Sequence, residues 1–93
     1  MYKHTITRVR PNTDVKWPGE TNGGVVINSK YSLTNTKILS EDGLTKQAIR
    51  QSEDSSVFTS IESDLANSSS DLYWITTYCD TNGITTTFTT EQV

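Results

Sequence analysis

The stretch DLYWITTYCDTNGI, from Asp71 to Ile84, decides the fold class of this chain. Read as a helix, it places Leu72, Ile75 and Cys79 on one face, and Asp71 can cap its start. Read as a strand, its aromatic and β-branched residues would form half of a hairpin in an all-β fold. We favour a helix from Leu72 to Cys79, and the chain is then α+β.

A second helix is predicted just before this stretch, and its signals are the clearest in the chain. Residues 54–56, Asp-Ser-Ser, supply capping side chains and negative charge where the first N–H groups of a helix are unpaired. Val57, Phe58, Ile61 and Leu65 follow at helical spacing. The segment therefore predicts an amphipathic helix that packs one face on the core.

Four further stretches have the pattern of strands. Residues 2–10 alternate, as do residues 84–90 near the end of the chain. Residues 31–39 and 44–52 are joined by Ser40-Glu41-Asp42-Gly43, which is typical of a hairpin turn. Thr is abundant in this chain, and its β-branched side chain suits a sheet with one hydrated face.

The segment between the first two strands is predicted to be mostly loop. From Asn12 to Lys30 it contains Pro18 and several glycines, which interrupt regular structure. Residues 24–30 alone can form a short helix or strand. The coarse order is thus strand, loop or short helix, strand, strand, helical region, strand.

The size of the chain favours one domain, residues 1–93, that associates with itself. A chain of this length buries only about 60 to 65% of the surface that it exposes when unfolded. Its hydrophobic share is 32%, and a single cysteine, Cys79, cannot form an intramolecular disulfide. A second subunit is the simplest source of further stability, so we expect a homodimer.

Thr5-Ile6-Thr7-Arg8 opens a strand, Glu41-Asp42-Gly43 makes a turn, and a helix through Tyr73 and Tyr78 runs into Asn82-Gly83-Ile84. This order resembles the ferredoxin-like half-barrels that pair into dimeric α/β barrels, a group including antibiotic-biosynthesis monooxygenase-like proteins. The resemblance implies a four-stranded antiparallel sheet with helices on one face and a second subunit on the other. The chain departs from the group at its first helix, which prolines and glycines shorten or remove.

Four side chains are candidates for a ligand pocket between helix and sheet. His4 is the only histidine, so any imidazole chemistry must use it. Trp74, Tyr78 and Phe88 could line the same cavity, although a small domain also needs its aromatic residues for the core. Cys79 fits a buried filler better than a nucleophile, and no catalytic residue is assigned.

No metal site and no cofactor are predicted, because the motifs that would hold them are missing from the sequence. Lys3, Arg8 and Arg10 make the first strand basic, and with Tyr2 and Trp17 they could form a small nucleic-acid or anion surface. A sequence pI near 4.9 opposes nucleic-acid binding. We therefore expect no nucleic-acid partner.

The sequence leaves three functional hypotheses. The leading one is a ferredoxin-like protein that forms a homodimer through its sheet and that has no enzymatic activity, or at most binds a small apolar or aromatic ligand. The alternatives are a cofactor-free monooxygenase-like enzyme and a structural component of a larger assembly such as a phage particle. No apolar run suggests a signal peptide or a membrane span, so we expect a cytoplasmic protein without a membrane partner.

Overall fold

The computed structural model describes residues 1–19 and 23–93. Its elements in chain order are β1 (Tyr2–Val9), α1 (Gly23–Tyr31), β2 (Thr36–Leu39), β3 (Thr45–Ser52), α2 (Ser56–Ala66), α3 (Tyr73–Thr81) and β4 (Thr85–Gln92). The strands form one antiparallel sheet in the order β2-β3-β1-β4. This is the ferredoxin-like order, with the second helical region divided into α2 and α3.

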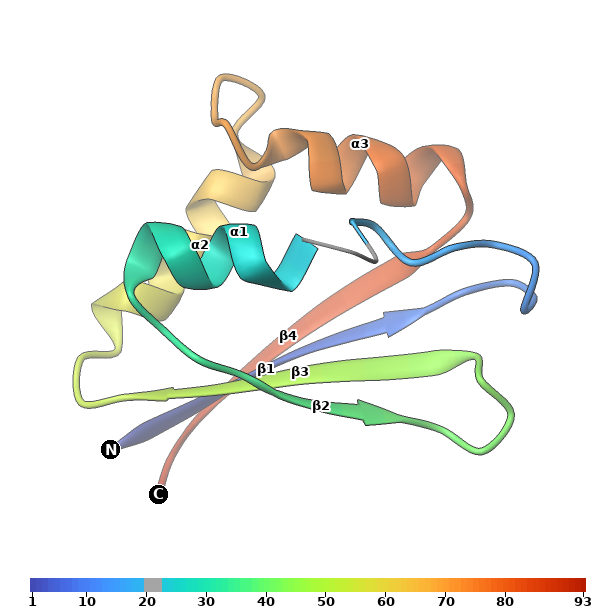
Figure 1. The fold of residues 1–93 in the computed structure, drawn as a ribbon. Coiled ribbons are helices and arrows are strands. Elements are labelled where there is room, and N and C mark those ends of the chain that lie inside the picture. Colours follow the sequence, from blue (N-terminus) through green and yellow to red (C-terminus); the bar gives the residue numbers. More distant parts are fainter. Residues whose placement is uncertain (20–22) are drawn as a thin grey trace.

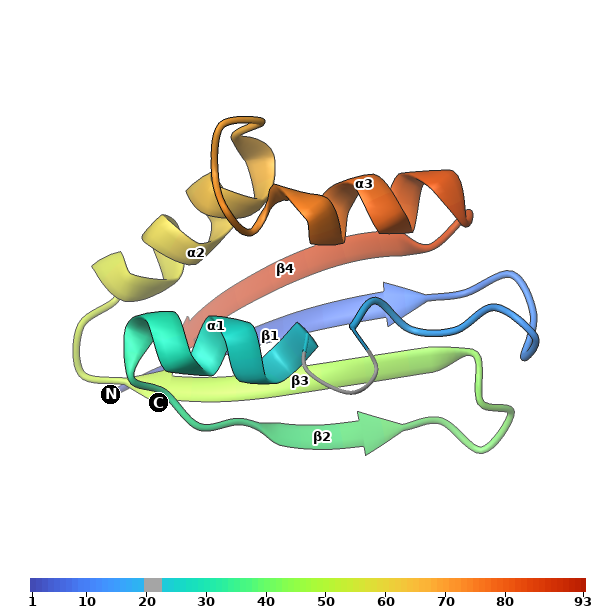
Figure 2. The same ribbon diagram turned by 45° about the horizontal axis from the view of Figure 1, so that its top comes forward.

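All three helices lie on the same face of the sheet (Figure 1). Helix α1 lies over the β3 side, α2 and α3 lie toward β4, and the opposite face is uncovered (Figure 2). The predicted α+β fold with a four-stranded antiparallel sheet is therefore confirmed, and the all-β alternative is wrong. Among the helices of residues 1–19 and 23–93, none has the length and apolar character needed to cross a bilayer.

The stretch that decides the fold is helical because its apolar residues recur on one face. Leu72, Ile75 and Cys79 are all buried in the core. The predicted cap is wrong, since Leu72 occupies the N-cap position without a side-chain bond and Asp71 turns outward to Lys30. Gly83 follows the helix with φ of 71°, a left-handed conformation that glycine adopts at little cost.

The predicted helix after residues 54–56 is confirmed as α2. Phe58, Ile61 and Leu65 are buried against the sheet, as their spacing predicts. Asp54 Oδ1 accepts a hydrogen bond of 2.9 Å from the Ser56 backbone N–H, so the acidic residue satisfies one of the unpaired donors at the helix start.

The region before β2 agrees with its prediction in part. The short helix that residues 24–30 could form is present as the nine-residue helix α1, while residues 20–22 lie outside the described residues. The strand predicted from Tyr31 begins only at Thr36, because Tyr31 completes α1. Ser32 then adopts φ of 55°, and the Leu33 N–H bonds back to the Asn28 carbonyl at 2.9 Å, which closes the helix.

The two faces of the sheet differ as the alternation in β1 predicts. His4 and Ile6 point toward the helices and are buried, together with Ile84 just before β4. The other face carries Thr5 and Thr7 of β1, and the register places more threonines of β4 beside them. The sheet thus has one face in the core and one hydroxyl-rich face.

Lys30 joins the end of α1 to the region of α2 and α3. Its Nζ lies 2.9 Å from Asp64 Oδ2 and 2.7 Å from Asp71 Oδ1. The Tyr31 hydroxyl, which also bonds Asp64, and then Lys30 lower the pKa of Asp64, and Lys30 lowers the pKa of Asp71. Their folded pKa values lie below the unfolded ones, so these groups contribute stability above about pH 4.

Substitution of Lys30 should therefore matter less at low pH. As the pH falls through the folded pKa values, both carboxylates are protonated and their contribution is lost. We expect Lys30→Met to lower the free energy of unfolding at pH 7 by more than at pH 3, measured by urea denaturation. A difference between the two proteins that is the same at both pH values would contradict this account.

Candidate functional site

The structure brings two of the four predicted pocket residues together. His4 is fully buried in the central strand, and its ring stacks on Phe58 at 4.8 Å and on Phe88 at 5.9 Å between centroids. His4 Nε2 lies 2.8 Å from Glu62 Oε2 on α2. The imidazole therefore connects β1 to α2, and its enclosed position suits a core residue.

Trp74 and Tyr78 lie apart from this cluster on α3. The Trp74 side chain is exposed, and the Tyr78 hydroxyl donates a hydrogen bond of 2.6 Å to the Lys16 carbonyl. Neither residue lines the cavity between the sheet and α1 or the cavity between α2, α3 and β4. Tyr78 instead fastens the segment before α1 to α3.

Removal of the Glu62 carboxylate should destabilise the fold. Glu62→Ala would leave the buried Nε2 of His4 without a partner, which costs about 1 to 3 kcal/mol. Glu62→Gln preserves the size and an oxygen acceptor, so its effect should be smaller. Urea denaturation of the two variants checks this order, and a Glu62→Ala protein as stable as the wild type would contradict it.

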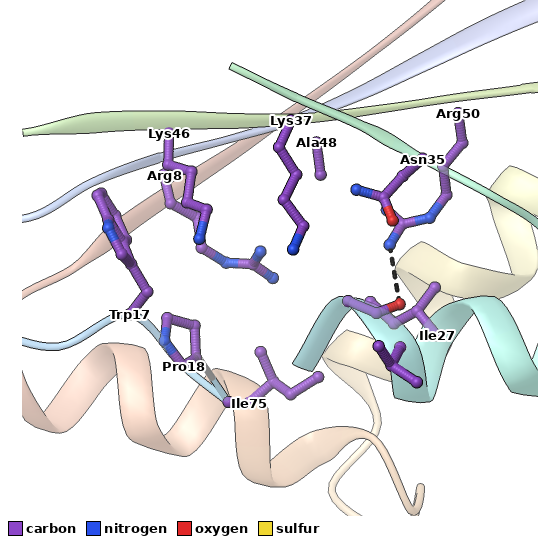
Figure 3. Close-up of a pocket in the computed structure, with 13 residues that line it drawn as sticks. Arg8, Trp17, Pro18, Ile27, Asn35, Lys37, Lys46, Ala48, Arg50 and Ile75 are labelled. Atoms are coloured by element: carbon purple, nitrogen blue, oxygen red, sulfur yellow. Dashed lines mark hydrogen bonds between the residues drawn. The ribbon is translucent and has the colours of Figure 1, made fainter. Parts of the chain in front are cut away.

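The most distinctive feature of the structure is a cationic cavity between the sheet and α1, with a volume of about 90 Å³ (Figure 3). Four of the eight Lys and Arg residues line it, and no described lining residue is Asp or Glu, although the chain carries a net charge of −3. The charged lining residues are Arg8, Lys37, Lys46 and Arg50. Positive charge is thus concentrated at one point of an acidic protein.

Strand register explains why these side chains meet. Arg8 pairs with Lys46 across β1 and β3, and Lys37 pairs with Ala48 across β2 and β3. Arg50 lies two residues beyond Ala48, so it points to the same face. Ala48 sits among these long side chains, and its single methyl group leaves the space that they surround.

A chain of hydrogen bonds orients the polar groups around the cavity. Arg50 can only donate, and its Nε bonds Asn28 Oδ1 at 2.7 Å. Asn28 Nδ2 must then be a donor, and it bonds Asn35 Oδ1 at 2.6 Å. The arrangement leaves Asn35 Nδ2, a second donor, at the cavity.

Three buried N–H groups at the cavity have no hydrogen-bond partner within residues 1–19 and 23–93. They are Arg8 Nε, Arg50 Nη1 and Asn35 Nδ2. An unpaired buried donor costs free energy, so such groups are uncommon in a folded interior. All three groups are hydrogen-bond donors, so a ligand that satisfies them must supply acceptors such as oxygen atoms.

The charges of Arg8 and Arg50 also favour an anion in the cavity. Arg50 is 1% exposed, and burial followed by the charge of Arg8 lowers its pKa to about 10. Burial also lowers the pKa of Arg8. Both guanidinium groups remain protonated at neutral pH, so two like charges share a poorly hydrated space. An anion between them would relieve that repulsion.

Apolar side chains close the cavity around the charges. Trp17 is buried, with Arg10 Cζ 4.6 Å and Lys46 Nζ 5.8 Å from its ring centroid. Arg10 is held in place by bonds of 2.8 Å to the carbonyls of Gly43 and Val15. Ile27 and Ile75 form the wall on the helix side (Figure 3). Such walls strengthen the hydrogen bonds that charged groups make inside.

The sequence pointed to only part of this site. Arg8 and Trp17 belong to the basic and aromatic set noted as a possible anion surface, whereas Lys3 of that set pairs with Glu91. The alternation of Lys46, Ala48 and Arg50 was the signal that sequence reasoning did not use, because it places two cations on one face of one strand. Within the described residues, no group of three or more metal-ligating side chains gathers.

Comparison with known proteins adds no relative to these observations: no protein-family model, no curated protein and no solved structure matches this chain.

Proposed function

We propose that this protein binds a small anionic ligand in the cavity between α1 and the sheet. The observation that carries the proposal is the convergence of three unpartnered buried donors, on Arg8, Arg50 and Asn35. A carboxylate or phosphate oxygen satisfies such donors, and its charge offsets that of the guanidinium groups. None of the four predicted pocket residues lines this cavity, so the proposed ligand is an anion in place of the predicted apolar or aromatic molecule.

The size of the cavity limits what enters it. A volume of about 90 Å³ is sufficient for a head group such as a carboxylate, sulfate or phosphate. Two of the three donors are held in place before binding, since Asn28 bonds both Arg50 and Asn35. Little side-chain ordering is then needed when the anion binds, which favours affinity.

Thermal unfolding with added anions tests the proposal. Phosphate, sulfate and acetate should raise the Tm of the wild type above that in chloride of equal ionic strength, because a ligand that binds only the folded state stabilises it. The rise should exceed that of Arg50→Met, since exclusion of sulfate and phosphate from the surface stabilises both proteins. At 100 times Kd the gain is about 2.7 kcal/mol. Each kcal/mol raises Tm by about 4 to 8 °C in a domain of this size. Equal Tm values in all four salts would reject the proposal.

We also propose that the uncovered face of the sheet pairs with a second copy of the chain. Its side chains are mainly threonines, with the apolar Val9, Ile38 and Ile49 among them. In the four strands, the charged residues of this face are Lys3 and Glu91, which lie 3.0 Å apart. The face therefore carries no net charge that would repel an identical one.

Sedimentation at micromolar concentrations tests the dimer. Thr87→Arg places a charge on this face and should dissociate the dimer, since an unpaired charge buried in the interface is costly. Thr59→Arg, on the exposed side of α2, is the matched control and should leave the dimer intact. A wild-type monomer at all concentrations would overturn the proposal.

A further inference from the structure

A second cavity, of about 470 Å³, lies between α2, α3 and β4. Much of its lining is apolar, with Leu65 and Ile75 from the helices and Ile84 and Phe88 from the region of β4. Its volume falls within the range of small-molecule sites, which are commonly apolar with a few polar groups. The cavity can therefore hold the body of an organic molecule.

The two cavities adjoin each other at Arg8. The strand β1 lies between β3, which lines the cationic cavity, and β4, which lines the second one. Arg8 from the sheet and Ile75 from α3 line both. Arg8 and Ile75 therefore lie at the boundary between the two cavities.

The two cavities differ in charge. The second cavity is lined by the carboxylates of Glu62 and Asp80 and also by Arg8, whereas the charged residues of the first are all Lys or Arg. The first cavity therefore attracts an anionic head group more strongly, while an apolar body gains by leaving water in the second. The pair of cavities therefore matches a molecule with a charged end and an apolar end.

We propose that the ligand is a small amphipathic organic acid, with its carboxylate between Arg8, Arg50 and Asn35 and its apolar body beyond Arg8 in the second cavity. This inference rests on the proposed anion-binding function. It adds the class of the ligand and its orientation. Leu65, Ile84 and Phe88 contact the body, and their apolar surface makes longer acids bind more tightly.

Calorimetric titration with acetate, butyrate, hexanoate and 3-phenylpropionate tests the inference. The affinity should rise about threefold to fourfold for each methylene added to the straight chain, until the body fills the cavity. Acetate should bind weakly and with the same dependence on Arg50 as the longer acids.

Two variants locate the body of the ligand. Ala66 and Thr86 line the second cavity, and Ala66→Trp or Thr86→Phe should occupy part of it. Each variant should abolish the increase in affinity with the length of the acid and leave the affinity for acetate unchanged. Thr59→Trp, an exposed position on α2 outside the lining, should retain the gain.

The outcomes separate this inference from the anion site itself. If all acids bind with the affinity of acetate, or if both cavity-filling variants keep the gain, the assignment of the body to the second cavity is overturned and the anion site stands. If neither the acids nor inorganic phosphate bind, both proposals fail. A gain that is lost in Ala66→Trp and Thr86→Phe but kept in Thr59→Trp supports the inference.

Discussion

Arg50→Met should abolish the stabilisation by anions while leaving the protein without anion within about 1 kcal/mol of the wild type. The substitution removes a buried charge and its repulsion by Arg8, which is favourable. It also removes the hydrogen bond to Asn28 Oδ1, which costs about 1 to 3 kcal/mol, and the longer one of 3.4 Å to the Gly24 carbonyl. These opposite effects on the free energy of unfolding offset one another. The charge of Arg50 therefore contributes more to anion binding than to the stability of the fold.

Two further variants distinguish the effect of the Arg50 charge from the effect of the cavity volume. Ala48→Leu fills the cavity without altering any charge, and it should remove the anion response as well. Lys16→Met removes one positive charge at an exposed position outside the lining and should keep the response. If Arg50→Met loses several kcal/mol of stability without anion, or if it still responds to phosphate, Arg50 has a structural role instead.

Phe58→Ala should cost about 3 to 5 kcal/mol of stability, the largest loss expected from a single core substitution in this chain. Phe58 is 0% exposed, and its ring lies against His4 with an interplanar angle of 8°. Its removal leaves a cavity and exposes one side of the buried imidazole. A domain of this length has a total stability of about 5 to 14 kcal/mol, so the loss is a large part of it.

Phe88→Ala is the natural comparison for Phe58→Ala. Phe88 also stacks on this imidazole, with centroids 5.9 Å apart, but it is only half-buried and lines the second cavity. Its removal should cost less, because water can reach the space that it leaves. Urea denaturation gives both values, and equal losses would contradict the view that α2 supplies the principal contact of His4.

The fold class could be predicted because the apolar spacing within the helices agrees with their packing in the tertiary structure. The burial of Phe58, Ile61 and Leu65 on α2, and of Ile75 on α3, is what their spacing predicted. The prediction was wrong at Asp71, because the amino group of Lys30, 41 residues away in sequence, bonds its carboxylate. Contacts between residues so far apart depend on the assembled fold and cannot be predicted from a short segment of sequence.

The candidate site was harder to foresee for a related reason. Alternation alone puts Arg8 on the same face as His4 and Ile6, and it puts Lys46 on the same face as Arg50. The meeting of these two sets depends on the pairing of β1 with β3, and sequence pattern does not give that register. The monooxygenase-like enzyme and the assembly component remain predictions.

The central claim is that Arg8, Arg50 and Asn35 bind an anion, and nuclear magnetic resonance of side-chain N–H groups tests it most directly. In a phosphate titration at constant ionic strength, the Arg8 Nε–H and Asn35 Nδ2 signals should shift together and saturate with one Kd. The Arg10 Nε–H signal should stay in place, because that group already bonds the Gly43 carbonyl. Signals of Arg8 and Asn35 that do not move, or that move no more than that of Arg10, would contradict the account.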